Sequence, residues 1–498
     1  MSLRRVFFGA CLSILFGQAA MAQTMRVGIN DDPDQLDPAL SRAFSARLVL
    51  STFCGKLFDI TPDLRVVPQL ATGFEWTNDN KTMVIKLRPG LKFDDGEPLD
   101  AEAVKYNFDR NINLPGSLRK SELLGVTTVD AVDPVTVHVN LKEPQAPLPS
   151  VLADRAGMMI SPKAGKALGQ NFGSGPSCAG PFKFVSRVAQ ARIIFEKNPN
   201  YFEADKVSIQ RVEFTPVIDT TVRLANLQSG QFDLIERVSP TDVEQIKKDS
   251  RLKLTVAPDL GFAYLQFNVN NGPRGKLLAD PRLREAIDLS IDREALVKVA
   301  FQNTFIAGNQ FVGPASYYFM KDVPVPKRDV AKARALLKEA GVPNLSFKLI
   351  VRPDRDFQVP AQVIQAMLKE SGIDMIVDTQ ENVTGLNNGA KGDFDALFSF
   401  WSGRVDPDGN IGHYMLCDGS ANSSKYCDPE ADKLLVQARQ KVEPADRKAF
   451  YDQIGRKFMK DRPLISLWYR QLFIAHTAKV QGFVAYPDGL VRLVGVKM

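Results

Sequence analysis

The chain has 498 residues, of which 44% are hydrophobic and 24% are charged. This length exceeds what one hydrophobic core usually serves, and the apolar content is too high for a disordered chain, so we expect a globular protein of two or three domains. The net charge of +6, from 63 basic and 57 acidic residues, is small for this length, and no basic block is present. A nucleic-acid partner is therefore not expected.

The first 22 residues are typical of a secretory signal peptide. Arg4-Arg5 precede an apolar run at positions 6–16, and Ala20-Met21-Ala22 offers small residues where a signal peptidase would read them. We expect cleavage before Gln23 and export to the periplasm. Every later apolar stretch is interrupted before it reaches the roughly 20 residues that a membrane-spanning helix needs.

Strand patterns come first along the mature chain. Met83, Ile85 and Leu87 share one face of residues 82–88, which predicts a strand with a single buried face. The same alternation over residues 135–142 predicts a second strand. His138 would then point to the polar face of that strand.

Helix patterns dominate after about residue 280. Asp280-Pro281 predicts an N-cap with proline in the first turn, and Asp292 predicts a second N-cap. Two more amphipathic helices are expected over residues 329–340 and 359–370, and each precedes an apolar extended segment. This alternation is the pattern of a sheet with crossover helices, so the fold class is mixed α/β.

Four cysteines follow the signal peptide, and export permits them to form disulfides. Three pairings are formally possible. Cys417 and Cys427 flank a polar stretch of loop-forming composition, so we pair these two. Cys54 and Cys178 are then paired by elimination. The sequence has no Cys-x-x-Cys motif and no neighbouring pair of histidines, so redox and metal chemistry are not expected.

Motifs for catalysis are missing from the sequence. The histidines His138, His413 and His476 are too far apart to form a helical metal pair. Ser177 lies in a segment that misses the spacing of a nucleophile elbow by one residue. Neither a phosphate-binding loop nor a dinucleotide fingerprint occurs. We therefore expect a binding protein without a cofactor or a resident metal.

Several segments occur in the order that is known from one family. The chain resembles the bacterial extracellular solute-binding proteins of the peptide/nickel type (family 5), which feed dipeptides, oligopeptides and similar solutes to ABC importers. The resemblance covers essentially the whole mature chain. The matching segments are 70–76 (LATGFEW), 86–96 (KLRPGLKFDDG), 99–104 (LDAEAV), 178–184 (CAGPFKF), 198–202 (NPNYF), 284–287 (REAI) and 291–293 (IDR).

The resemblance implies a fold of the periplasmic-binding-protein type, with two α/β lobes joined by a hinge and an extra domain inserted in the first lobe. By analogy, lobe I would comprise residues 23–53, 181–261 and 472–498, and lobe II would comprise residues 262–471. The inserted domain would comprise residues 54–180, and the inferred disulfide between Cys54 and Cys178 would close its base.

The resemblance also implies how the protein works. A monomeric receptor would close its lobes around a small peptide or peptide-like solute and deliver it to permease subunits in the inner membrane. A secreted hydrolase and a receptor that presents its ligand to a signalling partner are the alternatives. Nickel chelates, haem, glutathione and opine-like molecules are further family ligands, so the solute stays open.

Two positions of the family's ligand site can be matched by sequence. A buried peptide needs a cation for its carboxylate and usually an anion for its ammonium. Dipeptide-binding members hold the carboxylate with an Arg before a Pro, which Arg352 and Pro353 match, and Asp354 follows in the candidate site. Their ammonium-binding Asp lies three residues after a Trp. This chain has Arg404 at that distance from Trp401.

A buried Arg404 facing an ammonium would cost several kcal/mol, so recognition of a free peptide amino terminus is placed in doubt. Asp406 or Asp408 could supply the anion after a local gap. Alternatively, Arg404 and Arg352 clamp a ligand that has two acidic groups, which is the interpretation that we favour. A third alternative is an internal ion pair of Arg404 with Asp406 that only narrows the pocket.

The remaining members of the candidate site are Trp401 and Gly403. Trp401 ends an apolar run and is either core packing or a stacking wall for the ligand, and core packing is the safer prediction. Gly403 lies between Trp401 and Arg404.

Overall fold

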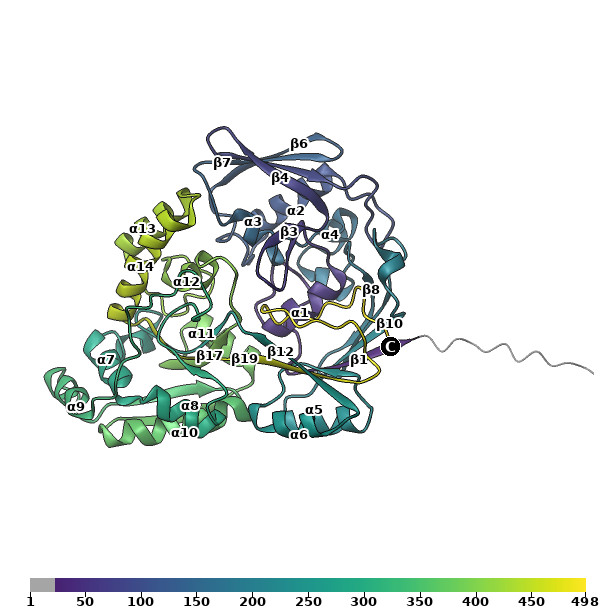
Figure 1. Cartoon of the computed structure of the whole chain (residues 1–498). Coiled ribbons are helices and arrows are strands. Elements are labelled where there is room, and N and C mark those ends of the chain that lie inside the picture. The colour runs from purple at the N-terminus through teal and green to yellow at the C-terminus, as the bar shows by residue number, and fades with distance from the viewer. Residues whose placement is uncertain (1–22) are drawn as a thin grey trace, which may run out of the picture.

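The structure is a computed structural model that describes residues 23–498, so the predicted signal peptide lies outside the described residues. Two large sheets, a four-stranded sheet and a two-stranded sheet organise this part of the chain (Figure 1). Figure 1 shows the four-stranded sheet at the top of the molecule, above the two large sheets.

The seven-stranded sheet gathers strands from both ends of the described chain, in the order β12-β19-β11-β1-β10-β9-β8. Strand β1 pairs in parallel with both β10 and β11. The strands are β1 (Thr24–Ile29), β8 (Phe182–Val188), β9 (Arg192–Lys197), β10 (Arg211–Pro216), β11 (Leu234–Ile235), β12 (Leu252–Pro258) and β19 (Gln471–Thr477).

The six-stranded sheet has the order β14-β18-β13-β17-β15-β16, in which β15 pairs in parallel with β16 and β17. Its strands are β13 (Phe262–Phe267), β14 (Ile306–Ala307), β15 (Ser346–Val351), β16 (Asp374–Thr379), β17 (Ala396–Trp401) and β18 (Leu464–Tyr469). The chain crosses between the two large sheets at residues 259–261 and again at Arg470.

The four-stranded sheet, with the order β4-β5-β7-β6, is antiparallel. Its strands are β4 (Ala71–Thr77), β5 (Thr82–Leu87), β6 (Val126–Asp133) and β7 (Thr136–Leu141), and the two-stranded sheet consists of β2 (Phe58–Ile60) and β3 (Val66–Pro68).

Helices cover these sheets. Those of the first half are α1 (Phe44–Phe53), α2 (Ala101–Asn113), α3 (Leu148–Val151), α4 (Pro162–Leu168), α5 (Thr220–Gln228) and α6 (Val243–Lys248). The later ones are α7 (Pro281–Ser290), α8 (Arg293–Phe301), α9 (Val330–Glu339), α10 (Arg355–Glu370), α11 (Asn382–Lys391), α12 (Asp408–Met415), α13 (Pro429–Gln440) and α14 (Pro444–Asp461). No helix among residues 23–498 has both the length and the apolarity to cross a membrane.

The helix predictions after residue 280 are confirmed, with one shifted boundary. The Asp280 carboxylate accepts a hydrogen bond from the Arg282 amide at the start of α7, and Asp292 caps α8 in the same way. Helix α10 begins at Arg355, four residues before the predicted start at 359. The buried side chain of Phe357 extends the apolar face of α10 backwards by one turn, past Pro360.

The prediction of a single buried face for β5 is wrong. Val84, on the face opposite Met83, is buried as well, because β5 lies in the middle of its sheet between β4 and β7. The Thr82 hydroxyl on that second face donates a hydrogen bond of 2.9 Å to Asn140 of β7. His138 is half-buried, between the fully buried Val137 and Val139, as its predicted position on the polar face requires.

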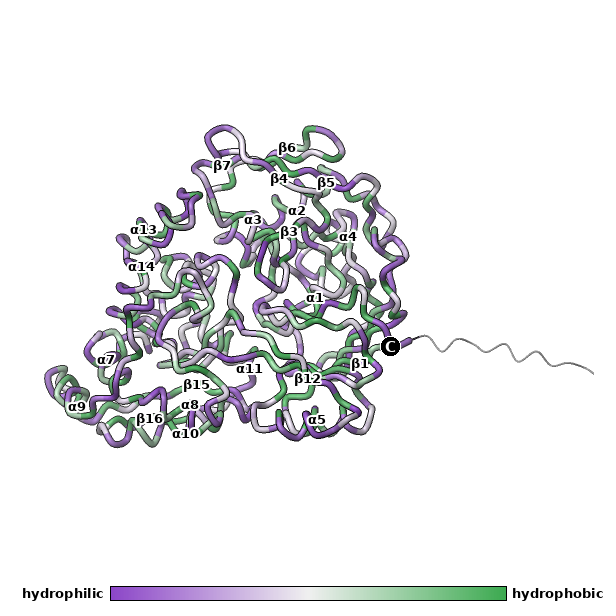
Figure 2. Tube along the Cα trace, in the orientation of Figure 1, coloured by the Kyte–Doolittle hydropathy of each residue, from purple (hydrophilic) through white to green (hydrophobic). Residues whose placement is uncertain are grey.

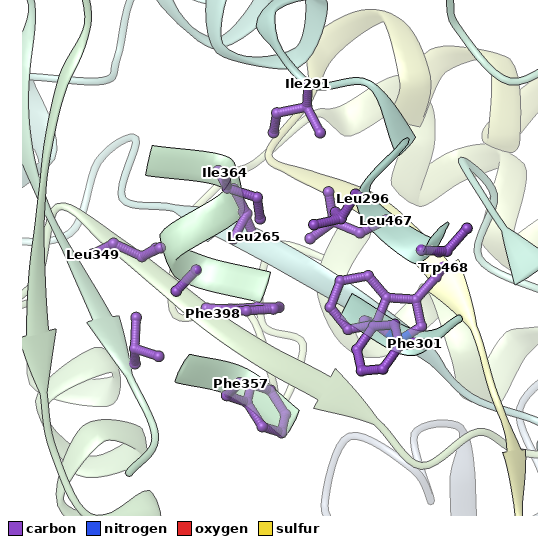
Figure 3. Packing of buried hydrophobic residues seen from close by; sticks show 14 of the residues in the cluster. Leu265, Ile291, Leu296, Phe301, Leu349, Phe357, Ile364, Phe398, Leu467 and Trp468 are labelled. Carbon is purple, nitrogen blue, oxygen red and sulfur yellow. The ribbon is translucent and has the colours of Figure 1, made fainter. Parts of the chain in front are cut away.

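The largest core packs the six-stranded sheet against helices α7 to α10 and continues to α5, α6 and the β12–β19 edge of the seven-stranded sheet. Figure 3 shows Phe398 of β17 facing Phe357 and Ile364 of α10, with the tilted rings of Trp468 and Phe301 beside them. In Figure 2 hydrophobic and hydrophilic residues alternate along outer helices such as α9 and α13, as expected for helices with one buried face.

Both predicted disulfides are present. Cys54 and Cys178 lie at the two ends of the segment that carries the four-stranded sheet, with their Cα atoms 4.8 Å apart. The Cα atoms of Cys417 and Cys427 are 4.4 Å apart, across the predicted polar loop.

Candidate functional site

A cavity of about 100 Å³ lies where the two large sheets meet the segment between α2 and β8. Its walls include residues just after the carboxyl ends of three strands, namely Arg237 after β11, Arg352 after β15 and Ser402 after β17. Such positions at the ends of parallel strands commonly hold ligands in α/β folds.

The charge of the lining is strongly unbalanced. Five arginines border the cavity, whereas Glu122 is the single carboxylate among its described lining residues. Neutral polar side chains, among them Gln266, Ser399 and Asn382, complete the wall on the side of the six-stranded sheet. A site with this balance attracts an anion and disfavours a cation.

Arg237 is held in an unusual backbone conformation. Its φ angle of 53° lies in the left-handed region, which costs free energy for a residue with a side chain. The guanidinium lies over the Phe44 ring, 4.3 Å from the ring centroid. Burial and the nearby Arg470 lower the pKa of Arg237 to about 10. At neutral pH it is still a cation, and its charge is only partly compensated.

Arg155 and Arg119 bring further positive charge from the segment between α2 and β8. Burial, together with the charge of Arg119, lowers the pKa of Arg155 to about 9. The Nη1 atom of Arg155 donates to the Ser41 carbonyl at 3.0 Å. Arg119 lies 2.6 Å from Glu122. Arg42, also in the lining, has its pKa lowered by burial and by Arg119.

His413 is a neutral member of the lining. Its Nδ1 atom lies 2.6 Å from the Ser420 hydroxyl, and its ring centroid lies 5.2 Å from that of Trp401. Burial and the positive charges of Arg404 and Arg119 lower the pKa of His413 to about 3. The imidazole therefore offers a hydrogen-bonding group without a charge.

We expect His413 to show no titration between pH 5 and pH 8 in histidine-edited NMR spectra, with His413→Gln identifying its signal. The unfolded chain binds a proton at this residue below its ordinary pKa of 6.5, whereas the folded protein does not until about pH 3. The contribution of His413 to stability therefore falls as the pH drops through 6.5 towards 3. A titration midpoint between pH 5 and pH 8 would contradict this.

Of the residues chosen from the sequence, Arg352 and Trp401 line the cavity. The Arg352 guanidinium lies 2.9 Å from the Asp354 carboxylate and 3.6 Å from the carboxylate of Asp31, which lies two residues after β1. Burial alone would lower the pKa of Arg352, but these two carboxylates outweigh it and raise the pKa. Asp354 serves as a support for Arg352 and lies outside the lining.

The structure places Arg404 outside the lining, so the expected clamp of Arg404 with Arg352 is not formed. Arg404 makes a close ion pair with Asp154, and its guanidinium lies 4.8 Å from the centroid of Trp401. Arg404 therefore forms an internal ion pair, as the third alternative predicted, but its partner is Asp154 and not Asp406. Asp154 lies far away in sequence and also holds Arg47 at 2.9 Å.

Asp406 and Asp408 are both occupied by internal arginines. Asp406 pairs with Arg447 at 2.6 Å, and Asp408 pairs with Arg439 at 2.8 Å. Neither carboxylate lines the cavity, so the structure does not bring them into position to replace a missing ammonium-binding Asp.

Gly403 shapes the backbone rather than the lining. Its φ of 68° and the 2.3 Å that would separate an added Cβ from the backbone of Leu260 make glycine necessary there. The turn at Gly403 directs Arg404 away from the cavity lining and towards Asp154. Trp401 packs against the core and also lines the cavity, and its Nε1 donates to Asn410 at 3.0 Å. Its role as a stacking wall for the ligand stays a prediction.

Sequence reasoning missed four of the five cavity arginines, namely Arg42, Arg119, Arg155 and Arg237. They come from separate segments with no common spacing, and each belongs to a loop or a single turn. One local signal was available for Arg42, because it lies two residues before α1, a helix that has no acidic residue in its first turn.

Comparisons with known proteins agree with this architecture. Residues 65–423 match the family described as bacterial extracellular solute-binding proteins, family 5 Middle. The glutathione-binding protein GsiB of Pectobacterium atrosepticum is 29% identical over 471 residues, which cover 91% of this chain and 90% of that protein. GsiB of Salmonella paratyphi A is 28% identical over 500 residues, covering 96% and 95%.

Solved structures share the fold over almost the whole chain. The binding protein AgaA from A. tumefaciens R10, in complex with agropinic acid, has a TM-score of 0.87 and 25% identity, covering 95% of this chain and 98% of that one. DppA from Helicobacter pylori, in complex with the peptide STSA, has a TM-score of 0.87, 22% identity and the same coverage. The predicted α/β fold of the periplasmic-binding-protein type is confirmed.

Proposed function

The chain belongs to the bacterial extracellular solute-binding proteins of family 5, and from this membership we propose that it captures an acidic, peptide-like solute in the cavity between its two large sheets. Its relatives are substrate-binding proteins, so the protein is a receptor for an ABC importer and not an enzyme. The alternative of a secreted hydrolase is set aside.

One observation carries the preference for an acidic solute, namely the five arginines in the lining against a single glutamate. A carboxylate in this cavity would accept hydrogen bonds from guanidinium groups that are already positioned by the fold. The ligands named for two relatives, glutathione and agropinic acid, are both acids. Solutes of this kind are therefore the first candidates.

We further propose the arrangement around this site. Lobe I is made from residues 23–53, 181–261 and 472–498, the inserted domain from 54–180 and lobe II from 262–471. The two crossings between the large sheets, at residues 259–261 and at Arg470, would serve as the hinge. Export through a signal peptide cleaved before Gln23, action in the periplasm as a monomer and docking on inner-membrane permease subunits complete the proposal.

Calorimetric titration with glutathione, agropinic acid and short peptides tests the function. We expect at least one acidic solute to bind, and X-ray scattering to show a smaller radius of gyration for the bound protein if the free protein is open in solution. Arg456→Gln, an exposed position that is paired with Asp322, serves as the control variant and should bind equally well. Binding of none of these solutes, or their chemical consumption, would contradict the proposal.

A further inference from the structure

The cavity arginines fall into two groups. The first arginine cluster consists of Arg42, Arg119 and Arg155, where the charge of Arg119 lowers the pKa of the other two. The second arginine cluster consists of Arg237 and Arg352, which act on each other and flank Asp31. The two clusters come from different parts of the fold. One lies at the start of α1 and in the segment between α2 and β8, and the other at the carboxyl ends of β11 and β15.

The first cluster has buried donors without a hydrogen-bond partner. These are the Nε atoms of Arg119 and Arg155, in side chains that are almost completely buried. A buried donor that makes no hydrogen bond is costly, and a guanidinium that lacks a full counter-charge is more costly still. An anionic group of a ligand at this end would satisfy both the donors and the charge.

The second cluster also has spare capacity for an anion. The Arg237 Nε atom lies 3.1 Å from the Glu236 carboxylate but makes no well-aligned hydrogen bond. Arg352 is directed by its 2.9 Å bond to Asp354. The strained φ of Arg237 and its stacking on Phe44 fix the guanidinium at the cavity wall. A second anionic group would be held at this end.

The two carboxylates near the cavity pair with arginines, although the Oδ2 atom of Asp31 accepts no hydrogen bond. Glu122 lies 2.6 Å from Arg119, and its other charged neighbour is His413 at 4.0 Å. Asp31 lies 3.6 Å from Arg352, outside the cavity lining. An ammonium entering the cavity would compete with an arginine for either carboxylate and would face the remaining arginines.

On these grounds we infer that the solute carries two anionic groups, one for each arginine cluster, and that the cavity does not require a free ammonium. The inference rests on the proposed function, because it specifies the solute of the same cavity. It differs from ordinary peptide recognition, which needs an anion for the amino terminus as well as a cation for the carboxylate.

The test uses S-methylglutathione, its N-acetyl derivative and its glycine-end ethyl ester as calorimetric probes. We expect the N-acetyl derivative to bind at least as tightly as the parent, because it keeps both carboxylates and loses only the ammonium. The ester, which has lost one anionic group, should bind about tenfold more weakly or worse. These three probes require no protein variant and therefore no assumption about folding.

Protein variants test whether each arginine cluster binds one anionic group of the solute. Arg155→Gln and Arg352→Gln should each weaken binding of the N-acetyl derivative by about tenfold or more, whereas Arg456→Gln should leave its affinity unchanged. Glu122→Gln should strengthen binding of this derivative, because it removes the carboxylate that competes for the first arginine cluster. Circular dichroism of each variant shows whether a loss of binding reflects a loss of folding.

Several results would overturn the inference while leaving the proposed function intact. One such result is that N-acetylation weakens binding by about tenfold. Another is that Glu122→Gln abolishes binding of S-methylglutathione. The third is that the wider titration finds binding only of solutes that have a single acidic group or that need their amine. If no solute of either set binds, the proposed function fails as well.

Discussion

Asp154→Ala is expected to lower the free energy of unfolding by about 3–5 kcal/mol, the usual cost of breaking a buried ion pair by removing one partner. The Asp154 carboxylate is almost completely buried and holds both Arg47 and Arg404, while Arg155 donates its backbone amide at 2.7 Å. Without the carboxylate these guanidinium groups would face one another with little compensation. Urea titration followed by circular dichroism measures the loss.

The pH range of this effect follows from the charge of Asp154. Burial alone would raise the pKa of Asp154, but Arg404 and Arg47 outweigh it and hold the pKa well below its ordinary value of 3.8. A carboxyl group with a depressed pKa contributes stability above its unfolded pKa and loses it only in strong acid. The difference between wild type and variant should therefore persist from pH 8 down to pH 5.

A matched control and a second variant separate buried charge from charge in general. Asp63→Asn removes an exposed carboxylate that pairs with Arg65, and it should leave stability nearly unchanged. Adding Arg404→Met to Asp154→Ala should recover part of the loss, because it removes one uncompensated guanidinium. If the double variant is less stable than Asp154→Ala alone, the electrostatic explanation is wrong.

The ion pair of Arg404 with Asp154 also explains a departure from the family pattern. Arg404 follows β17 of the six-stranded sheet, whereas Asp154 lies in the segment between β7 and β8, so the pair bridges two parts of the fold. Dipeptide-binding members place an Asp at the position of Arg404. This chain places a cation there and satisfies it with its own carboxylate.

The sequence was sufficient where the determining interactions are local. Capping by Asp280 and Asp292 acts over two or three residues, and the apolar alternation of a strand is visible in its own segment, so helices and strands were predicted well. Arg352 could be located because it immediately precedes a proline at a strand end. The polar composition between Cys417 and Cys427 likewise predicted the loop that their disulfide closes.

The rest of the site depends on contacts between distant segments. The partner of Arg404 is 250 residues away, and nothing in the spacing of Asp154 marks it as that partner. Arg237 owes its place to a left-handed backbone conformation and to Phe44, neither of which has a sequence signal at position 237. An arginine-rich cavity is therefore visible only after the sheets have been assembled.

Removal of the disulfide between Cys54 and Cys178 is expected to lower the free energy of unfolding by up to about 5 kcal/mol, against about 3 kcal/mol for the disulfide between Cys417 and Cys427. A disulfide stabilises mainly by restricting the unfolded chain, and the two bridges close loops of very different length, with sequence separations of 124 and 10. The measurement is urea unfolding of the two double Cys→Ser variants under identical oxidising conditions, so that neither leaves a free thiol.

The position of the disulfide between Cys54 and Cys178 predicts which part of the fold loses local stability when it is removed. Cys54 directly follows α1 and Cys178 lies four residues before β8, so this bridge fastens both ends of the segment that carries the four-stranded sheet. Hydrogen exchange should therefore increase in β4 to β7 before it increases in the six-stranded sheet. The variant without the short bridge serves as the matched control and should leave exchange in β4 to β7 unchanged. If that variant is the less stable of the two, loop closure does not determine how these bridges stabilise the fold.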